Sequence, residues 1–162
     1  MTRHSHCSYC GTRFTGASWP RTCAGCANVS YLNPIPVAVC LLPVDGGLLV
    51  IRRGIEPQLG RLALPGGFID GGETWQAAAA RELYEETGIT IDAAEVTLFS
   101  VHSVAERDLL LLFALARPRR AAELPAFVTT NETTERLVID KPTELAFVLH
   151  TQAAAAFFRG GK

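Results

Sequence analysis

One stretch of the sequence, residues 64–89, combines a glycine-rich segment with a cluster of carboxylates. Residues 64–73 hold four glycines and a proline, a composition that predicts a loop. Four alanines at 77–80 then favour a helix, and Gly88 predicts where that helix ends. At about 100° per residue, one face of this helix carries three carboxylates, Glu82, Glu85 and Glu86.

Two explanations fit this carboxylate cluster. Acidic side chains on one helix face usually form a solvated surface, where they repel one another. The glycine-rich loop leading into the cluster favours instead a site for a hard divalent cation. Mg²⁺ takes oxygen ligands, commonly a few carboxylates plus substrate phosphates, and it would remove the repulsion. Glycine also lets the backbone approach a ligand closely, because it has no side chain.

A second group of chemically active residues lies near the N-terminus, as two C-x-x-C pairs: Cys7, Cys10, Cys23 and Cys26. Each tight turn can direct two thiolates to one ion, so two turns predict a Cys₄ zinc site, although the gap between the pairs is slightly short. The alternatives are two disulfides in a secreted protein, or four incidental thiols. We favour structural zinc, because the segment is too short for a core and the metal would supply its folding energy.

The composition limits the classes of protein. The chain has 162 residues, 48% of them hydrophobic, which suits one domain with a small appendage. Fifteen basic and 16 acidic residues give no global charge that would favour nucleic acid or an anionic membrane. No apolar run approaches the ~20 residues of a membrane span. The N-terminus is polar and shows no signal-peptide core, so we expect a cytoplasmic location.

The cysteine-containing segment carries Arg3, Arg13 and Arg21 and no acidic residue. It could bind nucleic acid or phosphate, or it could be a structural clip for packing or for a homodimer. We favour the clip and expect no nucleic-acid partner, because the aromatic residues are few and the basic ones are scattered.

The spacing of residues 67–89 resembles the Nudix box of the Nudix hydrolases. Every fixed position of that signature is filled: Gly67, Glu73, Arg81-Glu82-Leu83, Glu85-Glu86 and Gly88-Ile89. The resemblance implies an α/β fold, an α/β/α sandwich with a mixed sheet. It also implies Mg²⁺- or Mn²⁺-dependent cleavage of a pyrophosphate that links a nucleotide to another moiety.

The same resemblance implies roles for individual residues. Glu82, Glu85 and Glu86 would bind metal and act in catalysis, and the carbonyl of Gly67 would be a further metal ligand. Arg81 would pair with Glu73 and brace the loop against the helix.

Nudix enzymes often place one more glutamate, from a distant loop, near the metals. We expect this residue to be Glu135 rather than Glu132, although either could be a simple loop acid. The general base stays open among Glu82, Glu85 and Glu135.

The whole-chain arrangement, a zinc ribbon at 1–33 before a Nudix hydrolase domain at 34–162, resembles two subgroups. One comprises ribbon-bearing ADP-ribose/FAD pyrophosphatases, which show stretches similar to residues 52–57 and 144–147. The other comprises NADH and NAD-cap pyrophosphatases, whose Ser-Gln-Pro-Trp motif is absent at residues 99–103. We therefore expect hydrolysis of a compound such as ADP-ribose or FAD. The alternatives are an NADH or NAD-cap pyrophosphatase, a nucleoside triphosphate pyrophosphohydrolase, or a non-catalytic nucleotide-binding module.

Strands must position these groups around the expected helix. Apolar runs predict strands at 37–42, 48–51, 61–64, 96–104, 109–116 and 137–139, and a closing helix at 151–159. Asp45-Gly46-Gly47 predicts a hairpin turn that joins the first two strands. Arg52, Arg53 and Arg61 lie at strand ends, where they could be solvated or could bind a substrate diphosphate.

Overall fold

The computed structural model describes residues 4–160 and separates the chain into two compact units. We call Met1–Pro34 the ribbon unit and Ile35–Lys162 the main unit. Within the described residues, no helix is long and apolar enough to cross a membrane.

The ribbon unit is built on two similar turns and one short strand pair. Strand β1 (Arg21–Thr22) pairs antiparallel with β2 (Val29–Ser30). In each turn a backbone N–H donates back to the first cysteine's carbonyl, from Gly11 to Cys7 at 2.9 Å and from Ala27 to Cys23 at 2.9 Å. Gly11 and Ala27 both have positive φ, 75° and 58°, which is how the turns close so tightly.

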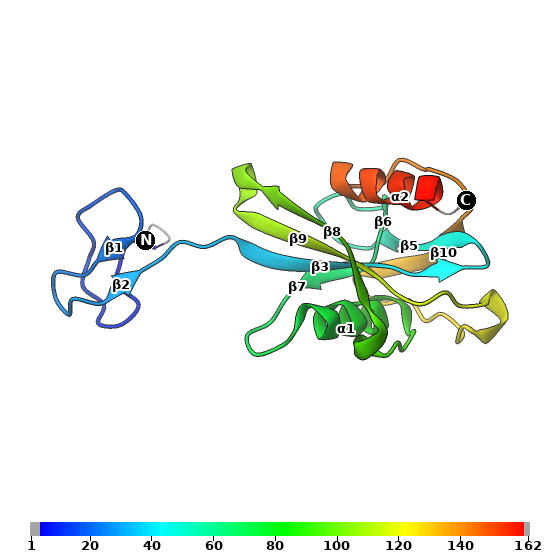
Figure 1. Ribbon diagram of the computed structural model, residues 1–162, viewed down its shortest axis with the longest axis horizontal. Coiled ribbons are helices and arrows are strands. Elements are labelled where there is room, and N and C mark those ends of the chain that lie inside the picture. The colour runs from blue at the N-terminus through cyan, green and yellow to red at the C-terminus, as the bar shows by residue number, and fades with distance from the viewer. Residues whose placement is uncertain (1–3, 161–162) are drawn as a thin grey trace. The chain divides into compact units, whose positions relative to one another are not determined.

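Two sheets form the centre of the main unit (Figure 1). The first has the order β7-β3-β9-β8, with bounds β3 (Ile35–Leu41), β7 (Gly66–Phe68), β8 (Thr97–Val104) and β9 (Leu109–Leu115). Its β3–β9 pair is parallel and its other pairs are antiparallel, so this sheet is mixed. The second is antiparallel, with bounds β4 (Pro43–Val44), β5 (Gly47–Arg53), β6 (Leu62–Ala63) and β10 (Thr133–Ile139), and β5 pairs with the other three.

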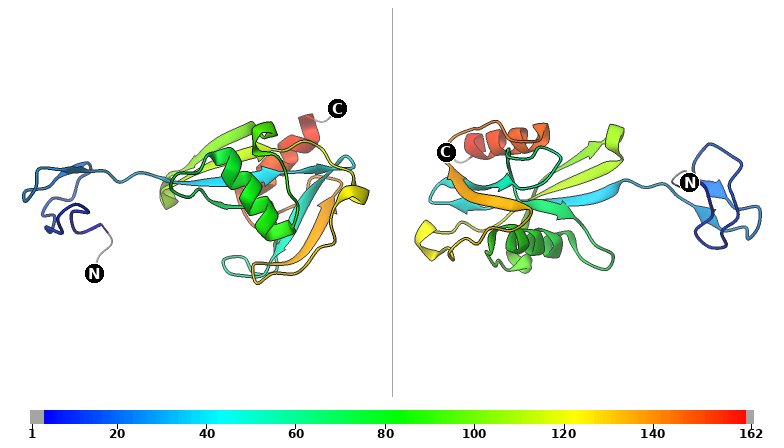
Figure 2. Two further views of the ribbon diagram at one scale, coloured as in Figure 1. Left: turned by 90° about the horizontal axis from the view of Figure 1, so that it is seen from below. Right: turned by 180° about the vertical axis from the view of Figure 1, so that it is seen from behind.

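Helices lie on both sides of the strands (Figures 1 and 2). Across residues 4–160, the α-helices are α1 (Trp75–Thr87) and α2 (Val148–Gly160), and the short 3₁₀ helices are η1 (Ala93–Glu95), η2 (Ala105–Arg107) and η3 (Ala121–Glu123). This arrangement confirms the predicted α/β/α sandwich with a mixed sheet.

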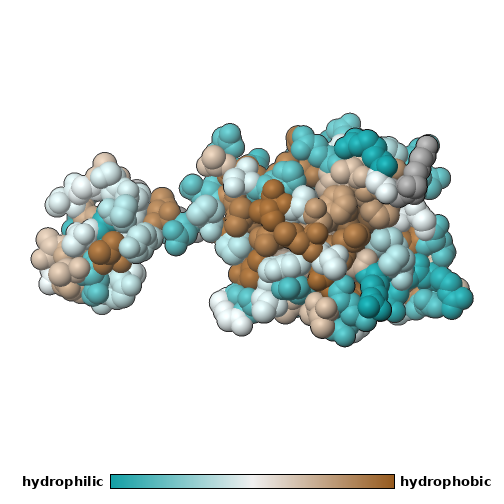
Figure 3. All heavy atoms as spheres, in the orientation of Figure 1, coloured by the Kyte–Doolittle hydropathy of each residue, from teal (hydrophilic) through white to brown (hydrophobic). Residues whose placement is uncertain are grey.

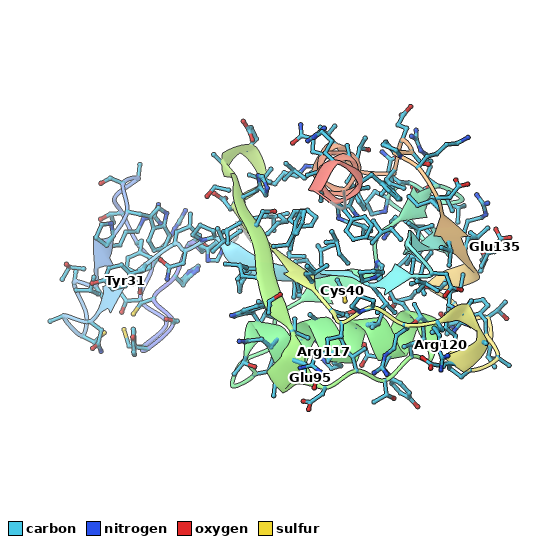
Figure 4. The ribbon with its side chains drawn as sticks, turned by 45° about the vertical axis from the view of Figure 1, so that its right-hand side comes forward. Tyr31, Cys40, Glu95, Arg117, Arg120 and Glu135 are labelled. Carbon is cyan, nitrogen blue, oxygen red and sulfur yellow. The ribbon has the colours of Figure 1, made fainter. Side chains whose placement is uncertain are left out.

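The hydrophobic core has two parts because side chains alternate along β3. Ala38 and Cys40 pack with Leu83 on the α1 side, whereas Val39 and Leu41 pack on the side of α2. Cys40 lies among the strands above α1 (Figure 4), and burial raises the pKa of its thiol to about 12, so it acts as a small apolar side chain.

Helix α1 ends at Gly88 as predicted, and it begins at Trp75, ahead of the four alanines expected to open it. The hydroxyl of Thr74 accepts a hydrogen bond from the Ala77 N–H at 3.2 Å, which caps the first turn. Gly88 adopts a left-handed conformation with φ of 74°, and its N–H donates to the Tyr84 carbonyl at 2.8 Å. The helix that carries the three carboxylates is therefore fixed by local sequence at both ends.

The hairpin at Asp45-Gly46 differs from the prediction in its first strand. Strand β5 pairs with β4, and β3 belongs to the other sheet, so the prediction that 37–42 pairs with 48–51 is wrong. The chain crosses between the sheets at Leu42, next to Pro43, which has no N–H to continue a ladder. Other boundaries shift: β10 begins at Thr133, before the predicted 137, and α2 begins at Val148, before the predicted 151.

Candidate active site

The glycine loop and helix α1 meet at β7, where backbone lies directly against two carboxylates. The Gly66 N–H donates to the Glu86 carboxylate at 2.9 Å. A Cβ added at Gly67 would lie 2.4 Å from the Glu82 carboxylate, and one at Gly66 would lie 2.4 Å from the Ala38 carbonyl oxygen. Gly66 therefore requires glycine, since a side chain would meet the backbone of β3, whereas a side chain at Gly67 would displace the Glu82 carboxylate.

Arg81 connects the loop and the acidic helix face through one guanidinium group. It donates to the Glu73 carboxylate at 2.9 and 3.1 Å, to Glu82 at 2.7 Å and to Glu85 at 3.2 Å. A further bond reaches the Phe68 carbonyl at 2.9 Å. The contact between Arg81 and Glu73 that the Nudix resemblance implies is thus present.

Burial makes negative charge costly at two of the three helix carboxylates. The pKa of Glu86 is raised to about 8, chiefly by burial and also by the nearby charge of Glu82, against the hydrogen bond from the Gly66 N–H. Burial also raises the pKa of Glu82, against the effect of Arg81. The Glu85 side chain is 54% exposed. The site therefore favours a proton or a cation beside Glu82 and Glu86.

The donor set of this region fits a hard divalent cation, because all its side-chain donors are carboxylate oxygens. In the structure these carboxylate oxygens do not converge on one point, because Glu82 and Glu85 both form ion pairs with Arg81. Among the described residues, only the four cysteines of the ribbon unit bring three or more such ligand atoms close together. Binding a cation between Glu82 and Glu86 would require Glu82 to turn away from Arg81.

The distant glutamate beside this site is Glu132, and the expectation of Glu135 does not fit the structure. A cavity of about 290 Å³ is lined by Glu85, Glu86 and Glu132, together with Thr130 and Asn131. The charge of Glu132 also contributes to the raised pKa values of Glu82 and Glu86.

Strand alternation explains why Glu135 lies elsewhere. Its neighbour Arg136 donates to the Thr87 carbonyl of α1 at 2.7 Å, so Arg136 faces α1 and Glu135 faces the opposite way. Glu135 forms an ion pair at 2.7 Å with Arg52, its cross-strand partner on β5, and lies at the surface of the main unit (Figure 4).

The three arginines expected to bind substrate lie in different environments. Arg52 is paired with Glu135 and also donates to the Gly60 carbonyl at 2.9 Å, and Arg61 is paired with Glu144 at 2.7 Å. Arg53 alone acts on the acidic site, since its charge lowers the pKa of Glu86. Its guanidinium also donates to the Pro57 carbonyl at 2.8 Å. Arg52 and Arg61 therefore fit the alternative of solvated strand ends.

Arg136 is a residue that no sequence pattern singled out. Besides Thr87 it donates to the Pro125 carbonyl at 2.6 Å, so it joins the C-terminal end of α1 to the loop that leads to Glu132. That loop is also held by the Gly54 N–H, which donates to the Glu132 carbonyl at 2.7 Å. Only knowledge of which face of β10 meets α1 would have identified Arg136.

The four cysteines of the ribbon unit form a separate cluster. Their sulfur atoms all lie within 4.8 Å of one another, with Cys7 to Cys26 at 3.7 Å and Cys10 to Cys23 at 3.5 Å, and all four thiols are free. A tetrahedron with Zn–S bonds of about 2.3 Å places its sulfurs about 3.8 Å apart. Hydrogen bonds with Thr12 lower the pKa of Cys10 to about 6, which favours a thiolate there. Against hydrogen bonds with Asn28, burial and the neighbouring cysteines raise the pKa of Cys26 to about 11. The cluster fits a tetrahedral metal ion.

Comparisons with known proteins agree with this geometry. The NUDIX domain family matches residues 33–157. An ADP-ribose pyrophosphatase of Methanocaldococcus jannaschii is 38% identical over 78 residues, which is 48% of this chain and 45% of that protein. An NAD-capped RNA hydrolase NudC of Edwardsiella ictaluri is 31% identical over 90 residues, which is 54% of this chain and 35% of that protein. The chain thus spans less than half the length of either relative.

A solved structure shows the same fold over nearly the whole chain. The crystal structure of a NUDIX hydrolase from Nitrosomonas europaea superposes with a TM-score of 0.77, covers 96% of this chain and 90% of its own, and is 24% identical. The family match extends over the glycine loop, α1 and the Glu132 loop, the three segments that build the acidic site. The chain belongs to the NUDIX domain family.

Proposed function

We propose that the protein is a divalent-metal-dependent pyrophosphohydrolase whose substrate is a nucleoside diphosphate linked to a second moiety. The observation that carries this proposal is the packing of Glu82 and Glu86 against the Gly66-Gly67 backbone. A buried pair of carboxylates, with Glu132 nearby, gathers negative charge that a cation would neutralise.

The role that we propose for each residue follows from its position in the site. A bound Mg²⁺ or Mn²⁺ supplies charge neutralisation for the anionic pyrophosphate and lowers the pKa of water. Glu82, Glu86 and Glu132, with the Gly67 carbonyl, are the oxygen donors that would hold it. Glu85 is half exposed at the cavity and is our candidate to accept the proton of the attacking water.

Two further residues would act on the loop and on the substrate. Arg81 and Glu73 brace the glycine loop against α1, so they would position these donors. Arg53, the one predicted arginine whose charge acts on the acidic site, would bind a phosphate oxygen of the substrate.

The substrate is expected to be ADP-ribose or FAD, ahead of NADH and of nucleoside triphosphates. A relative named as an ADP-ribose pyrophosphatase and the absence of the Ser-Gln-Pro-Trp motif both support this order. The similarity to proteins named as NAD-capped RNA hydrolases supports a second candidate, cleavage of NADH or an NAD cap.

The test is an activity screen with Mg²⁺ and Mn²⁺ over ADP-ribose, FAD, NADH, diadenosine polyphosphates and nucleoside triphosphates. Specificity is a ratio of kcat/KM values, so that ratio is the quantity to compare. We expect ADP-ribose or FAD to rank first. A nucleoside triphosphate that exceeds both by more than ~10-fold, about 1.4 kcal/mol, would instead indicate a triphosphatase. No metal-dependent hydrolysis of any of them would indicate a nucleotide-binding module.

We further propose that Cys7, Cys10, Cys23 and Cys26 bind one structural Zn²⁺, which makes residues 1–33 a zinc ribbon. The free thiols, their mutual distances and the two matching turns support this assignment. Metal analysis of protein purified without added zinc should find about one zinc per chain.

A further inference from the structure

The Glu132 loop, residues 124–132 between η3 and β10, has little apolar anchorage. Leu124 packs against the core on the α1 side, but within the described part of the chain residues 125–132 belong to neither part of the core. Hydrophilic residues cover much of the main unit where η3 and the start of this loop lie (Figure 3). A loop with so few apolar contacts is held in place mainly by its polar contacts.

The tip of the loop is shaped by hydrogen bonds near Glu132. The Thr130 hydroxyl accepts from the N–H of Glu132 at 3.2 Å and from the N–H of Thr133 at 3.0 Å. The Thr130 N–H in turn donates to the Thr133 carbonyl at 2.9 Å, and the Gly54 N–H joins the tip to the end of β5. These bonds do not reach α1, so they shape the tip without tying it to the helix.

Arg136 ties this loop to α1. Its guanidinium donates to the carbonyl of Thr87, the residue after Glu86, at 2.7 Å and to the Pro125 carbonyl at 2.6 Å. It also lies 5.6 Å from the centroid of the Phe127 ring, within the range of a cation–π contact. Across residues 4–160, no other hydrogen bond links α1 to this loop or to β10. One side chain therefore joins the last residue of the helix to the first part of the loop.

The chemistry of arginine suits this position. The last carbonyls of a helix lack partners within the helix and carry partial negative charge. The last turn of α1 holds no basic side chain, so Arg136 supplies a positive charge there from β10. The planar fork of a guanidinium can donate to two carbonyls at once, whereas the ammonium of lysine is a point charge.

We propose that Arg136 is a positioning residue for the acidic site, because it holds the Glu132 carboxylate opposite Glu85 and Glu86. The cavity of about 290 Å³ lies between the end of α1 and the tip of the Glu132 loop, the two segments that Arg136 joins. Arg136 itself does not line this cavity, so it acts through Glu132. The inference rests on the proposed function, because the spacing of these carboxylates matters where a cation binds among them.

A double-mutant cycle on Mn²⁺ binding tests this role. Titration with Mn²⁺, followed by electron paramagnetic resonance of the free ion, gives the dissociation constant without any turnover. We expect Arg136→Gln to weaken Mn²⁺ binding by ~10-fold, the scale for a residue that orients a metal ligand. In the Glu132→Gln background the same substitution should cost less than ~2-fold, because the carboxylate that Arg136 positions is already absent.

Two further variants complete the design. Arg136→Lys keeps the charge at the helix end but loses the fork, so it should show the same dependence on Glu132 with a smaller loss. If Arg136→Gln does not fold, as judged by circular dichroism, the cycle with Arg136→Lys decides. Arg117→Gln is the control, since it removes an exposed arginine that is paired with Glu95 at 3.0 Å. It should leave the dissociation constant within ~2-fold of the wild-type value in both backgrounds.

Equal losses of Mn²⁺ binding with and without the Glu132 carboxylate would mean that Arg136 supports the fold in general, and they would overturn the proposal. So would wild-type affinity in both Arg136 variants. The expected dependence on Glu132, in a protein that hydrolyses no diphosphate, would instead overturn the proposed function alone.

Discussion

Glu86 carries a carboxylate at a place where charge is costly, with the residue only 6% exposed. Replacing Glu86 with Gln keeps the shape of the side chain and an acceptor for the Gly66 N–H, but removes the charge. Turnover should fall by at least ~100-fold, the scale for loss of a metal-binding or acid–base group. Thermal stability without metal should hold or rise, because burial of charge and repulsion by Glu82 are relieved. Glu85→Gln should lower turnover similarly, and near-normal turnover in both variants would contradict the site.

Glu132 and Glu135 are close in sequence but lie in different surroundings, so substitution of each in turn tests which one acts at the site. Glu132 lines the acidic cavity, whereas Glu135 is paired with Arg52 on the other side of β10. Glu132→Gln should therefore lower kcat by more than ~10-fold and raise the Mg²⁺ concentration needed for activity. Glu135→Gln is the control and should change both values by less than ~2-fold. The reverse order would restore the prediction made from the sequence.

His150 should make the protein less stable in mild acid. Burial, assisted by the charge of Arg53, lowers the pKa of its imidazole to about 3 from 6.5, and its Nδ1 accepts the Leu64 N–H at 3.2 Å. Below pH 6.5 the unfolded chain binds a proton that the folded chain excludes. The free energy of unfolding should therefore fall between pH 6.5 and about 3, by up to about 1.4 kcal/mol per pH unit from this group.

Urea denaturation between pH 4 and 8 measures this effect. In His150→Asn the amide oxygen can accept the Leu64 N–H and does not titrate, so the pH dependence should become shallower. His102→Asn, on β8, is the control and should keep the wild-type slope. An unchanged slope in His150→Asn would show that other groups govern acid stability.

The glycine loop and helix α1 act as one element, because the loop backbone lies directly against carboxylates of the helix. In Gly67→Ala the new Cβ meets only the Glu82 side chain, which can turn aside, so the fold should persist while kcat falls by ~10-fold or more. In Gly66→Ala the new Cβ meets the backbone of Ala38 and Val39, which cannot move freely. This variant should lose several degrees in Tm, and circular dichroism melts with parallel assays would separate the two effects.

Elements held by hydrogen bonds between nearby residues could be predicted from the sequence, whereas pairings between distant segments could not. Thr74 and Gly88 fix α1 through bonds within a few residues, so the helix and its acidic face follow from the sequence. The partner of β5 depends on where the chain leaves one sheet for another, which an apolar run does not encode. The positions of Glu132 and Glu135 relative to α1 could not be predicted for the same reason, because this requires knowing that Arg136 faces α1.

At the scale of the whole molecule, each unit has its own source of stability. The main unit contains both parts of the hydrophobic core, whereas the ribbon unit has the cysteine cluster. A strong chelator should therefore unfold the ribbon unit and leave the Tm of the main unit within ~2 °C. Trp19 reports on the ribbon unit in a Trp75→Phe variant, since the chain has two tryptophans. A single transition that shifts with zinc would show that the units unfold together.

The parallel pair of β3 and β9 has a consequence for the order in which the chain folds. Ile35 pairs with Leu109 and Leu41 with Leu115, so the central ladder of the main unit joins segments far apart in sequence. Closing such a long loop is slow, because its entropy is lost before the contacts form. The turns of the ribbon unit close over a few residues each. During synthesis, the ribbon unit can thus form before the ribosome has made β9, and truncation ahead of residue 109 should leave a main unit that cannot fold.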